Sequence, residues 1–262
     1  MTGRGYGELD VAMPPLPHSP ATSSSSPSRQ STIAASLGYA ALAATDSILA
    51  GKDTKAAKRL RMLVKPTLMP LLGKAFTGST SGDTSLLRRG TVTAQAFSWG
   101  GDVALLGPGQ KSFLGGVGSF AGAHLAYIAG LLSVRGETSQ YNRTGLKAAA
   151  TLWVTTAPVM AWAAGRKDPA LRGPVAAYAT LLAAMFASSW TLDPGLRRSG
   201  RHLLQAGTTL FLVSDSILGA QEFLLTERDP RLERAVMATY TAGQALIAGG
   251  VAVIEADRTA GG

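Results

Sequence analysis

The feature that most constrains this chain is a succession of apolar segments separated by short charged connectors. Eight such segments follow residue 31, each about 18–24 residues long, which is the length a helix needs to cross a hydrocarbon core of about 30 Å. They lie at about 32–51, 61–79, 90–107, 112–134, 147–165, 173–192, 202–225 and 234–254. We therefore predict an all-α polytopic transmembrane helical bundle with about eight membrane-spanning helices.

A soluble, alanine-rich helical bundle is the alternative fold, because the mean hydropathy is only +0.16. That value is low because the segments are built from Ala, Gly, Ser and Thr rather than Leu and Ile. Small residues favour close helix packing inside a membrane, as in the GSFAG stretch at 118–122. A soluble helix needs a polar face, whereas 173–192 offers only hydroxyl groups, one Tyr and one Trp. The membrane bundle is therefore favoured.

Charge and composition limit the kinds of partner and cofactor that we expect for this chain. The net charge of +9 falls in short Lys and Arg clusters between apolar runs, a distribution typical of membrane proteins rather than of nucleic-acid binding. The chain has no cysteine, which excludes disulfides and cysteine-based metal sites. His124 and His202 show no metal-binding spacing, so we predict no metal and no cofactor. The oligomeric state stays open.

The chain divides into three parts. Residues 1–30 are rich in Pro, Ser and Gly and contain no apolar core of a signal peptide, so we predict a disordered tail. Residues 31–256 form the predicted transmembrane domain, and 257–262 a short C-terminal tail. We expect a multipass protein of a bacterial cell membrane.

Carboxylates inside the spans are candidate functional groups, because a charged side chain near the bilayer centre costs at least about 2.5–3.5 kcal/mol. Asp102 follows Gln95 and Ser98 on one helical face, so a polar stripe leads to it. Asp215 has apolar sequence on both sides. Asp46 lies near a basic connector and is either a supporting residue or a side chain that reaches the interface. We predict a functional role for Asp102 and Asp215.

Lys65 is a candidate binding residue in the second segment. It precedes Pro66, and Pro70 follows; a proline-broken helix at membrane depth is tolerated where it lines a cavity. A buried ammonium group would pair with Asp102 or Asp215. The alternative is a lysine that extends from the charged connector to the interface.

Other polar side chains in the spans complete the candidate substrate-binding set. His124 and Tyr127 share an aromatic stripe of the 112–134 segment, although a lone histidine is equally consistent with a hydrogen-bonded core residue. Tyr178, Tyr240 and Gln244 are further candidates in later segments. Asp46 and Lys65 belong to the same predicted set.

These motifs together resemble the YhhN-type family of multipass lysoplasmalogenases. The matching stretches, in family order, are VKPTLMPLL, AFSWGGDVALL, FLGGVGSFAGAHLAYI, PVAAYATLLAAM, GTTLFLVSDSILGAQEF and ATYTAGQALI. The resemblance implies an eight-helix membrane hydrolase that cleaves the vinyl-ether bond of lysoplasmalogens, which are lysophospholipids of the bilayer, to a fatty aldehyde and a glycerophospho-base. The family's paired intramembrane aspartates fall on Asp102 and Asp215, so the resemblance implies that these two are the catalytic residues. Lys65, His124, Tyr127 and Tyr178 match other recurring positions.

The chemistry that the resemblance implies agrees with two buried carboxyl groups. A vinyl ether hydrolyses by proton addition to its β-carbon, and water then captures the oxocarbenium ion. One carboxylic acid to donate the proton and one carboxylate to stabilise the cation or activate water would suffice. Two alternatives stay open: a proton- or cation-coupled transporter that uses the same carboxylates, and a structural factor in which polar residues only hold helices together.

Overall fold

The computed structural model describes Thr2, residues 29–80 and residues 84–260. The helices are α1 (Arg29–Ala50), α2 (Lys55–Ser79), α3 (Leu86–Ala104), α4 (Gly109–Leu132), α5 (Arg143–Lys167), α6 (Arg172–Ser188), α7 (Arg198–Phe223) and α8 (Pro230–Ala260), with 3₁₀ turns η1 (Thr138–Gln140) and η2 (Pro169–Leu171). Over these ranges the chain forms no β-strand, and one isolated antiparallel bridge joins Arg135 to Leu192. The predicted all-α bundle is confirmed.

The chain termini differ in part from the prediction. The predicted N-terminal tail lies outside the described residues except for Thr2 and for Arg29 and Gln30, which already belong to α1. Helix α8 continues to Ala260, so residues 257–260 are helical rather than part of a tail. Arg258, within this extension, lies 3.8 Å from the Glu255 carboxylate one turn back.

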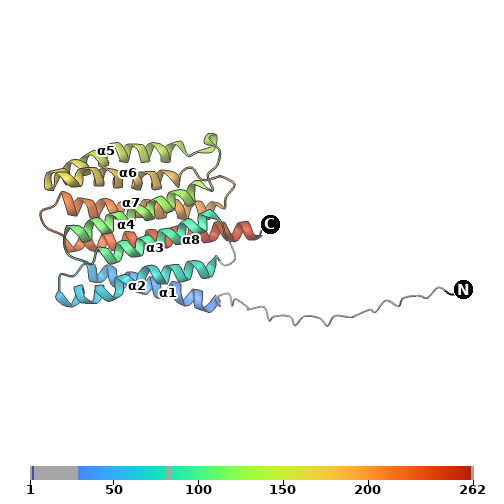
Figure 1. Cartoon of the computed structure of the whole chain (residues 1–262), viewed down its shortest axis with the longest axis horizontal. Helices are drawn as coiled ribbons and strands as arrows, with labels where there is room; N and C mark the ends of the chain where they lie inside the picture. Colours follow the sequence, from blue (N-terminus) through green and yellow to red (C-terminus); the bar gives the residue numbers. More distant parts are fainter. Residues whose placement is uncertain (1, 3–28, 81–83, 261–262) are drawn as a thin grey trace.

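The helices pack mainly as consecutive antiparallel pairs: α1 with α2, α3 with α4, α5 with α6, and α7 with α8. Figure 1 shows α1 and α2 on one side of the bundle, α5 and α6 on the other, and the remaining four helices between them. Helix α8 contacts α1, α2 and α3 in addition to α7, so it is the central helix of the bundle. Short connectors account for this pairing, because neighbouring elements joined by few residues pack side by side.

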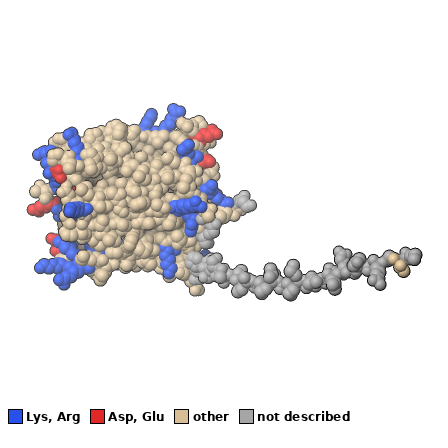
Figure 2. Space-filling view, viewed as in Figure 1, with Lys and Arg blue, Asp and Glu red and all other residues tan. Residues whose placement is uncertain are grey.

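The outer surface fits a membrane. Five helices of the described chain contain a stretch long and apolar enough to cross a bilayer, namely α1, α4, α6 with its preceding 3₁₀ turn, α7 and α8. The other three carry charged residues within their length, as at Lys65 and Lys74 in α2. In Figure 2 the charged side chains gather toward the two ends of the helices and leave an uncharged belt between them. The protein is a helical membrane bundle.

Helix α2 runs without a break through Pro66 and Pro70, contrary to the expected broken helix. A proline has no N–H, so Pro70 leaves the carbonyl of Pro66 without its helical donor. The indole Nε1 of Trp99 on α3 donates to that carbonyl at 2.9 Å. A neighbouring helix therefore supplies the missing hydrogen bond, which allows α2 to stay helical.

Glycines set the closest helix contacts, and one of the two glycines of the GSFAG stretch takes part in such a contact. A Cβ at Gly207 of α7 would lie 2.9 Å from the carbonyl oxygen of Gly243 on α8, so both helices need glycine there. Of the two GSFAG glycines, Gly122 packs against the Phe97 ring, whereas an added Cβ at Gly118 would meet no described atom within 4 Å. Tight small-residue interfaces thus lie between α7 and α8 and also between α3 and α4, where a Cβ at Gly90 would lie 2.7 Å from the carbonyl oxygen of Ala126.

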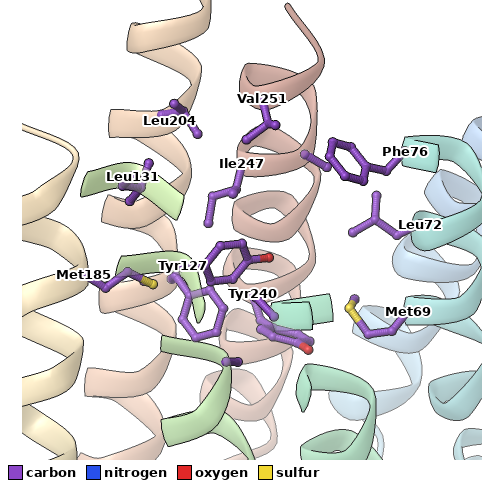
Figure 3. Close-up of a cluster of buried hydrophobic side chains, with 14 of the residues drawn as sticks. Met69, Leu72, Phe76, Tyr127, Leu131, Met185, Leu204, Tyr240, Ile247 and Val251 are labelled. Carbon is purple, nitrogen blue, oxygen red and sulfur yellow. The ribbon is translucent and has the colours of Figure 1, made fainter. Parts of the chain in front are cut away.

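A packed apolar core fills the bundle between α2, α4, α6, α7 and α8. Its central side chains, shown in Figure 3, are Met69, Leu72, Phe76, Tyr127, Leu131, Met185, Leu204, Tyr240, Ile247 and Val251. Tyr240 lies where this core meets a cavity at the end of the bundle that contains the α1–α2 and α7–α8 connectors. The core therefore forms the floor of the cavity.

Candidate functional site

The site is a cavity of about 680 Å³ at one end of the bundle. Helices α2, α3, α4, α7 and α8 and the turn after α5 form its walls. Its charged lining groups come from six connectors or helix ends and comprise Arg61, Lys65, Asp102, Lys167, Asp168, Asp215, Glu222, Arg228 and Glu233. Lys65, Asp102 and Asp215 were predicted from sequence, and the fold brings all three to this one cavity.

Asp102 is a buried carboxylate with two donors. It lies near the end of α3 and is 1% exposed. One carboxylate oxygen, Oδ1, lies 3.4 Å from the Lys65 ammonium group of α2, and the other accepts a hydrogen bond of 2.8 Å from the Tyr240 hydroxyl of α8. Three helices thus converge on this carboxylate, and one of its two partners is an ammonium group.

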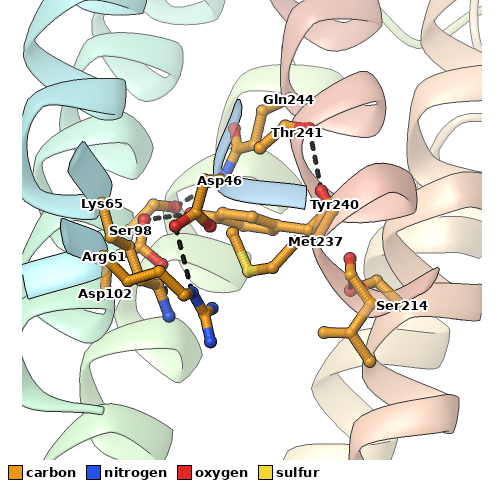
Figure 4. Close-up of polar contacts among 11 residues, drawn as sticks. Asp46, Arg61, Lys65, Ser98, Asp102, Ser214, Met237, Tyr240, Thr241 and Gln244 are labelled. Carbon is orange, nitrogen blue, oxygen red and sulfur yellow. Dashed lines mark hydrogen bonds and ion pairs between the residues drawn. The ribbon is translucent and has the colours of Figure 1, made fainter. Parts of the chain in front are cut away.

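Asp46 does not reach the interface or the cavity; it is fully buried behind the cavity wall. Its Oδ1 accepts a hydrogen bond of 3.1 Å from Nε of Arg61, as Figure 4 shows. Arg61 itself lines the cavity one helical turn before Lys65. Asp46 therefore holds a cavity-lining guanidinium group in place, which agrees with a supporting position.

Asp215 has a different environment from Asp102. It lies on α7, lines the cavity and accepts a hydrogen bond from the Tyr178 hydroxyl of α6 on its Oδ2 oxygen. The same oxygen lies 3.7 Å from Nε2 of His124 on α4. No lysine or arginine of the described chain forms an ion pair with Asp215. Its neighbours are a phenol and an imidazole.

His124 is fully buried and fixed in orientation. Its Nδ1 lies 2.6 Å from the carbonyl oxygen of Phe120, and its ring packs against the rings of Phe211 and Tyr178 at centroid distances of 5.0 and 5.2 Å. Because a carbonyl oxygen only accepts, Nδ1 carries a hydrogen and Nε2 faces Asp215.

Tyr127 and Gln244 lie deeper than the cavity, in the packed core. The Tyr127 hydroxyl donates to Oε1 of Gln244 at 2.5 Å, and Nε2 of Gln244 donates to Ser98 Oγ at 2.9 Å. Neither residue lines the cavity. Ser98 lies on α3 one turn before Asp102, so this chain of hydrogen bonds supports the helix that carries the carboxylate rather than contacting the cavity contents.

Ion pairs surround the mouth of the cavity. Arg228, in the α7–α8 connector, lies 2.6 Å from Glu222 and 3.0 Å from Glu233. The Lys167 ammonium group at the end of α5 donates to the backbone carbonyl of Glu222. These contacts tie the ends of α5, α7 and α8 together next to the cavity.

Asp168 is a partly exposed carboxylate at the same mouth. It accepts a hydrogen bond of 2.8 Å from Gln110 Nε2 and one of 2.9 Å from the Ala170 N–H. These two hydrogen bonds, above all that of Gln110, hold the pKa of Asp168 below its usual value. Asp168 therefore presents a negative charge at the mouth at neutral pH.

An apolar groove of about 110 Å³ joins the cavity at Asp215. Helices α4, α5, α6 and α7 form it, and its lining includes Val117, Trp153, Met160, Tyr178, Ala179, Leu182 and Gly219. Leu105, Phe113, Phe120, Asp215 and Leu218 line both spaces. Asp215 thus stands at the boundary between a charged cavity and an apolar groove.

Several lining residues are absent from the sequence-based prediction. Arg61 is four residues before Lys65 on one helical face, and that spacing is a usable signal. Arg228 and Asp168 lie outside the α-helices, where helical periodicity gives no information about direction, and Glu233 lies in the first turn of α8. Only the packing of α5, α7 and α8 brings them to the mouth.

The fold and site define a multipass membrane protein with a charged cavity buried among its helices. A family model described as the YhhN family matches residues 60–251. The chain belongs to this family. No curated protein and no solved structure matches the chain.

Proposed function

We propose that the protein hydrolyses the vinyl-ether bond of lysoplasmalogens, releasing a fatty aldehyde and a glycerophospho-base in a bacterial cell membrane. The observation that carries this proposal is the position of the two carboxyl groups. Asp102 and Asp215 line one cavity, and Asp215 adjoins an apolar groove between α4 and α7. The family membership supports a membrane protein of this type, and the hydrolysis itself is our proposal.

The two spaces match the two parts of a lysolipid. A single hydrocarbon chain suits the apolar groove, because few polar atoms line it. The cavity mouth offers Arg61 and Lys65 to a phosphate group and the partly exposed carboxylate of Asp168 to an amine. The bond that joins chain and glycerol then lies near Asp215.

The depth of the site agrees with this placement. Asp215 precedes the end of α7 at Phe223 by eight residues, or about 12 Å at 1.5 Å per residue. The ether bond of a lysolipid in a bilayer lies just below the headgroup, at a comparable depth. Substrate can therefore reach the carboxyl groups from the membrane without crossing it.

Two carboxyl groups supply the chemistry. One donates a proton to the β-carbon of the vinyl ether, and the other stabilises the resulting oxocarbenium ion and activates water. His124, Tyr178 and Tyr240 position these groups through the contacts given above. Tyr127, Gln244 and Asp46 act one layer further out, on the helices and on Arg61.

The test is aldehyde release by purified protein in detergent. We expect wild-type protein to release fatty aldehyde from a lysoplasmalogen and none from the matched saturated alkyl-ether lysolipid, which has no double bond to protonate. If no vinyl-ether lysolipid yields aldehyde, the proposal fails. Proton-coupled flux in sealed vesicles, without aldehyde release, would favour a transporter instead.

A further inference from the structure

The two carboxyl groups of the site differ in what faces them, and this difference assigns their roles. Nδ1 of His124 lies 2.6 Å from the Phe120 carbonyl oxygen and therefore carries a hydrogen. In the neutral imidazole the other nitrogen, Nε2, presents a lone pair. Nε2 lies 3.7 Å from Oδ2 of Asp215 and has no hydrogen-bond partner among the described residues.

A lone pair that faces a charged carboxylate in a buried site is unfavourable. Placing one proton on Asp215 removes this repulsion, because a carboxylic acid O–H can point toward Nε2 of His124. The alternative, an imidazolium beside a carboxylate, creates two charges next to the rings of Phe211 and Tyr178. Burial disfavours that charged pair unless further hydrogen bonds satisfy it, and Nε2 has none.

Asp102 differs from Asp215 in having an ammonium neighbour, since each carboxyl group also accepts a hydrogen bond from one phenol, Tyr240 at Asp102 and Tyr178 at Asp215. The Lys65 ammonium group lies 3.4 Å from one of its oxygens, and the Tyr240 hydroxyl donates to the other at 2.8 Å. Both neighbours favour the charged carboxylate. Asp46 does not compete for Lys65, since its own partner is Arg61 at 3.1 Å.

We infer that Asp215 is the proton donor of the pair and that His124 is the positioning residue that holds its proton. Asp102 is the carboxyl group that is charged in the resting protein. This assignment rests on the proposed function for the identity of the substrate. The arrangement of protons in the resting protein does not depend on it, since it follows from contacts within the chain.

The assignment gives a balanced reaction. The Asp215 carboxylic acid gives its proton to the β-carbon, leaving an oxocarbenium ion and an Asp215 carboxylate. Water adds to the cationic carbon and gives one proton to Asp102. This step converts the oxocarbenium ion to a hemiacetal. The hemiacetal hydroxyl then returns a proton to Asp215 as the carbon–oxygen bond to glycerol breaks, and Asp102 protonates the departing alkoxide. The products are the aldehyde and the glycerophospho-base, and both carboxyl groups regain their starting states.

Other titratable groups surround Asp215 from every packed element. They are Arg61 and Lys65 of α2, Asp102 of α3, His124 of α4, Lys167 of α5, Asp168 between α5 and η2, Tyr178 of α6, Glu222 of α7, Arg228 of the α7–α8 connector, and Glu233 and Tyr240 of α8. Because so many groups titrate nearby, a pH–rate profile alone does not identify the donor. A site-resolved signal for the proton is needed.

Infrared spectroscopy of the resting protein supplies this signal. Full-length protein with ¹³C-carboxyl-labelled aspartate, in detergent at neutral pH, should show the C=O stretch of a protonated aspartic acid. We expect the band to persist in Asp102→Asn and to vanish in Asp215→Asn. We expect His124→Gln to shift it, whereas His202→Gln, at an exposed histidine of α7, leaves it in place.

The outcomes separate the two proposals. The assignment is overturned if wild-type protein shows no such band. It is also overturned if the band is lost in Asp102→Asn and kept in Asp215→Asn. The wild-type spectrum gives a result even where a variant does not fold. A band with the expected dependence on Asp215, in protein that releases no aldehyde from vinyl-ether lipids, supports the assignment while the proposed function fails.

Discussion

Both ends of the bundle contain a buried carboxyl group. The carboxyl groups of Asp102 and Asp215 line the cavity at one end, whereas the buried carboxyl group at the other end does not line it. At the opposite end Glu255 of α8 is 2% exposed and accepts a hydrogen bond of 2.8 Å from Ser85. Arg258 lies 3.8 Å from it. Tyr240 and Glu255 are fifteen residues apart on α8, or about 22 Å along the helix.

The comparison shows that a buried acid does not by itself make a site. Glu255 resembles Asp102 in burial, in its hydroxyl donor and in its basic neighbour, yet it lines neither the cavity nor the groove. A cavity and a second carboxyl group that lines it distinguish the end with the proposed site. Glu255 thus provides an internal control for the chemistry.

The largest expected effect is loss of turnover on removing either cavity carboxyl group. Asp215→Asn and Asp102→Asn should each lower aldehyde release by at least about 100-fold, because general acid–base groups contribute about 10²–10⁴-fold. Glu255→Gln should keep most of the activity, since this residue lies outside the cavity. Initial rates of the three purified variants test the contrast, and loss of activity in Glu255→Gln alone would contradict it.

The Lys65–Asp102 pair should matter for stability as well as for rate. Lys65→Met leaves the buried Asp102 carboxylate without its ammonium partner, which should lower the free energy of unfolding by about 3–5 kcal/mol. The double variant Lys65→Met/Asp102→Asn should recover much of this loss, because it also removes the charge. Thermal unfolding in detergent compares the stability of the single and double variants with that of wild-type protein. Lys147→Met, at an exposed lysine, is the control. Equal melting temperatures of the single and double variants would show that the pair is not charged.

Tyr240 should have a smaller effect, and chiefly on rate. Tyr240→Phe removes one hydrogen bond to the Asp102 carboxylate, an interaction worth about 1.5–3 kcal/mol with a charged acceptor. We expect the rate of aldehyde release to fall about tenfold or more. Tyr39→Phe removes a hydrogen bond of 2.7 Å to a backbone carbonyl of α8 and should cost about 1 kcal/mol of stability without that loss of rate. Similar rates in the two variants would remove Tyr240 from the account.

The apolar groove should affect binding rather than turnover. Ala179→Phe places a ring in the groove between α4 and α7. Displacing about two methylene groups of the substrate chain, at about 0.8 kcal/mol each, should raise KM about tenfold and leave kcat nearly unchanged. Ala177→Phe, on the exposed face of the same helix, is the matched control. A fall in kcat at constant KM would place the chain elsewhere.

The sequence predicts the helices well because their apolar lengths are set by the thickness of the bilayer. It does not show that α2 stays intact through Pro66 and Pro70, because the compensating donor, Trp99, comes from another helix. At the far end α8 continues past Asp257 to Ala260, beyond the apolar segment from which its length is predicted.

The polar residues of the spans can be found from sequence. Whether each of them lines the cavity or lies in the core below it cannot. Asp102, Asp215 and Lys65 line the cavity, whereas Tyr127 and Gln244 lie in the core below it. All five are polar groups in apolar segments, so only the rotation of each packed helix separates lining groups from supporting ones. Asp168 and Arg228, at the mouth, lie outside the α-helices and carry no periodic signal.

The most direct test of the central claim is the deuterium content of the aldehyde that wild-type protein releases from a lysoplasmalogen in D₂O. Reduction of the aldehyde to the alcohol as it forms would prevent later exchange. Proton transfer to the β-carbon predicts one deuterium at carbon 2 of the product, with product and label lost together in Asp215→Asn. Aldehyde without deuterium at carbon 2 would contradict the account, because the vinyl ether would then have been cleaved without protonation of its double bond.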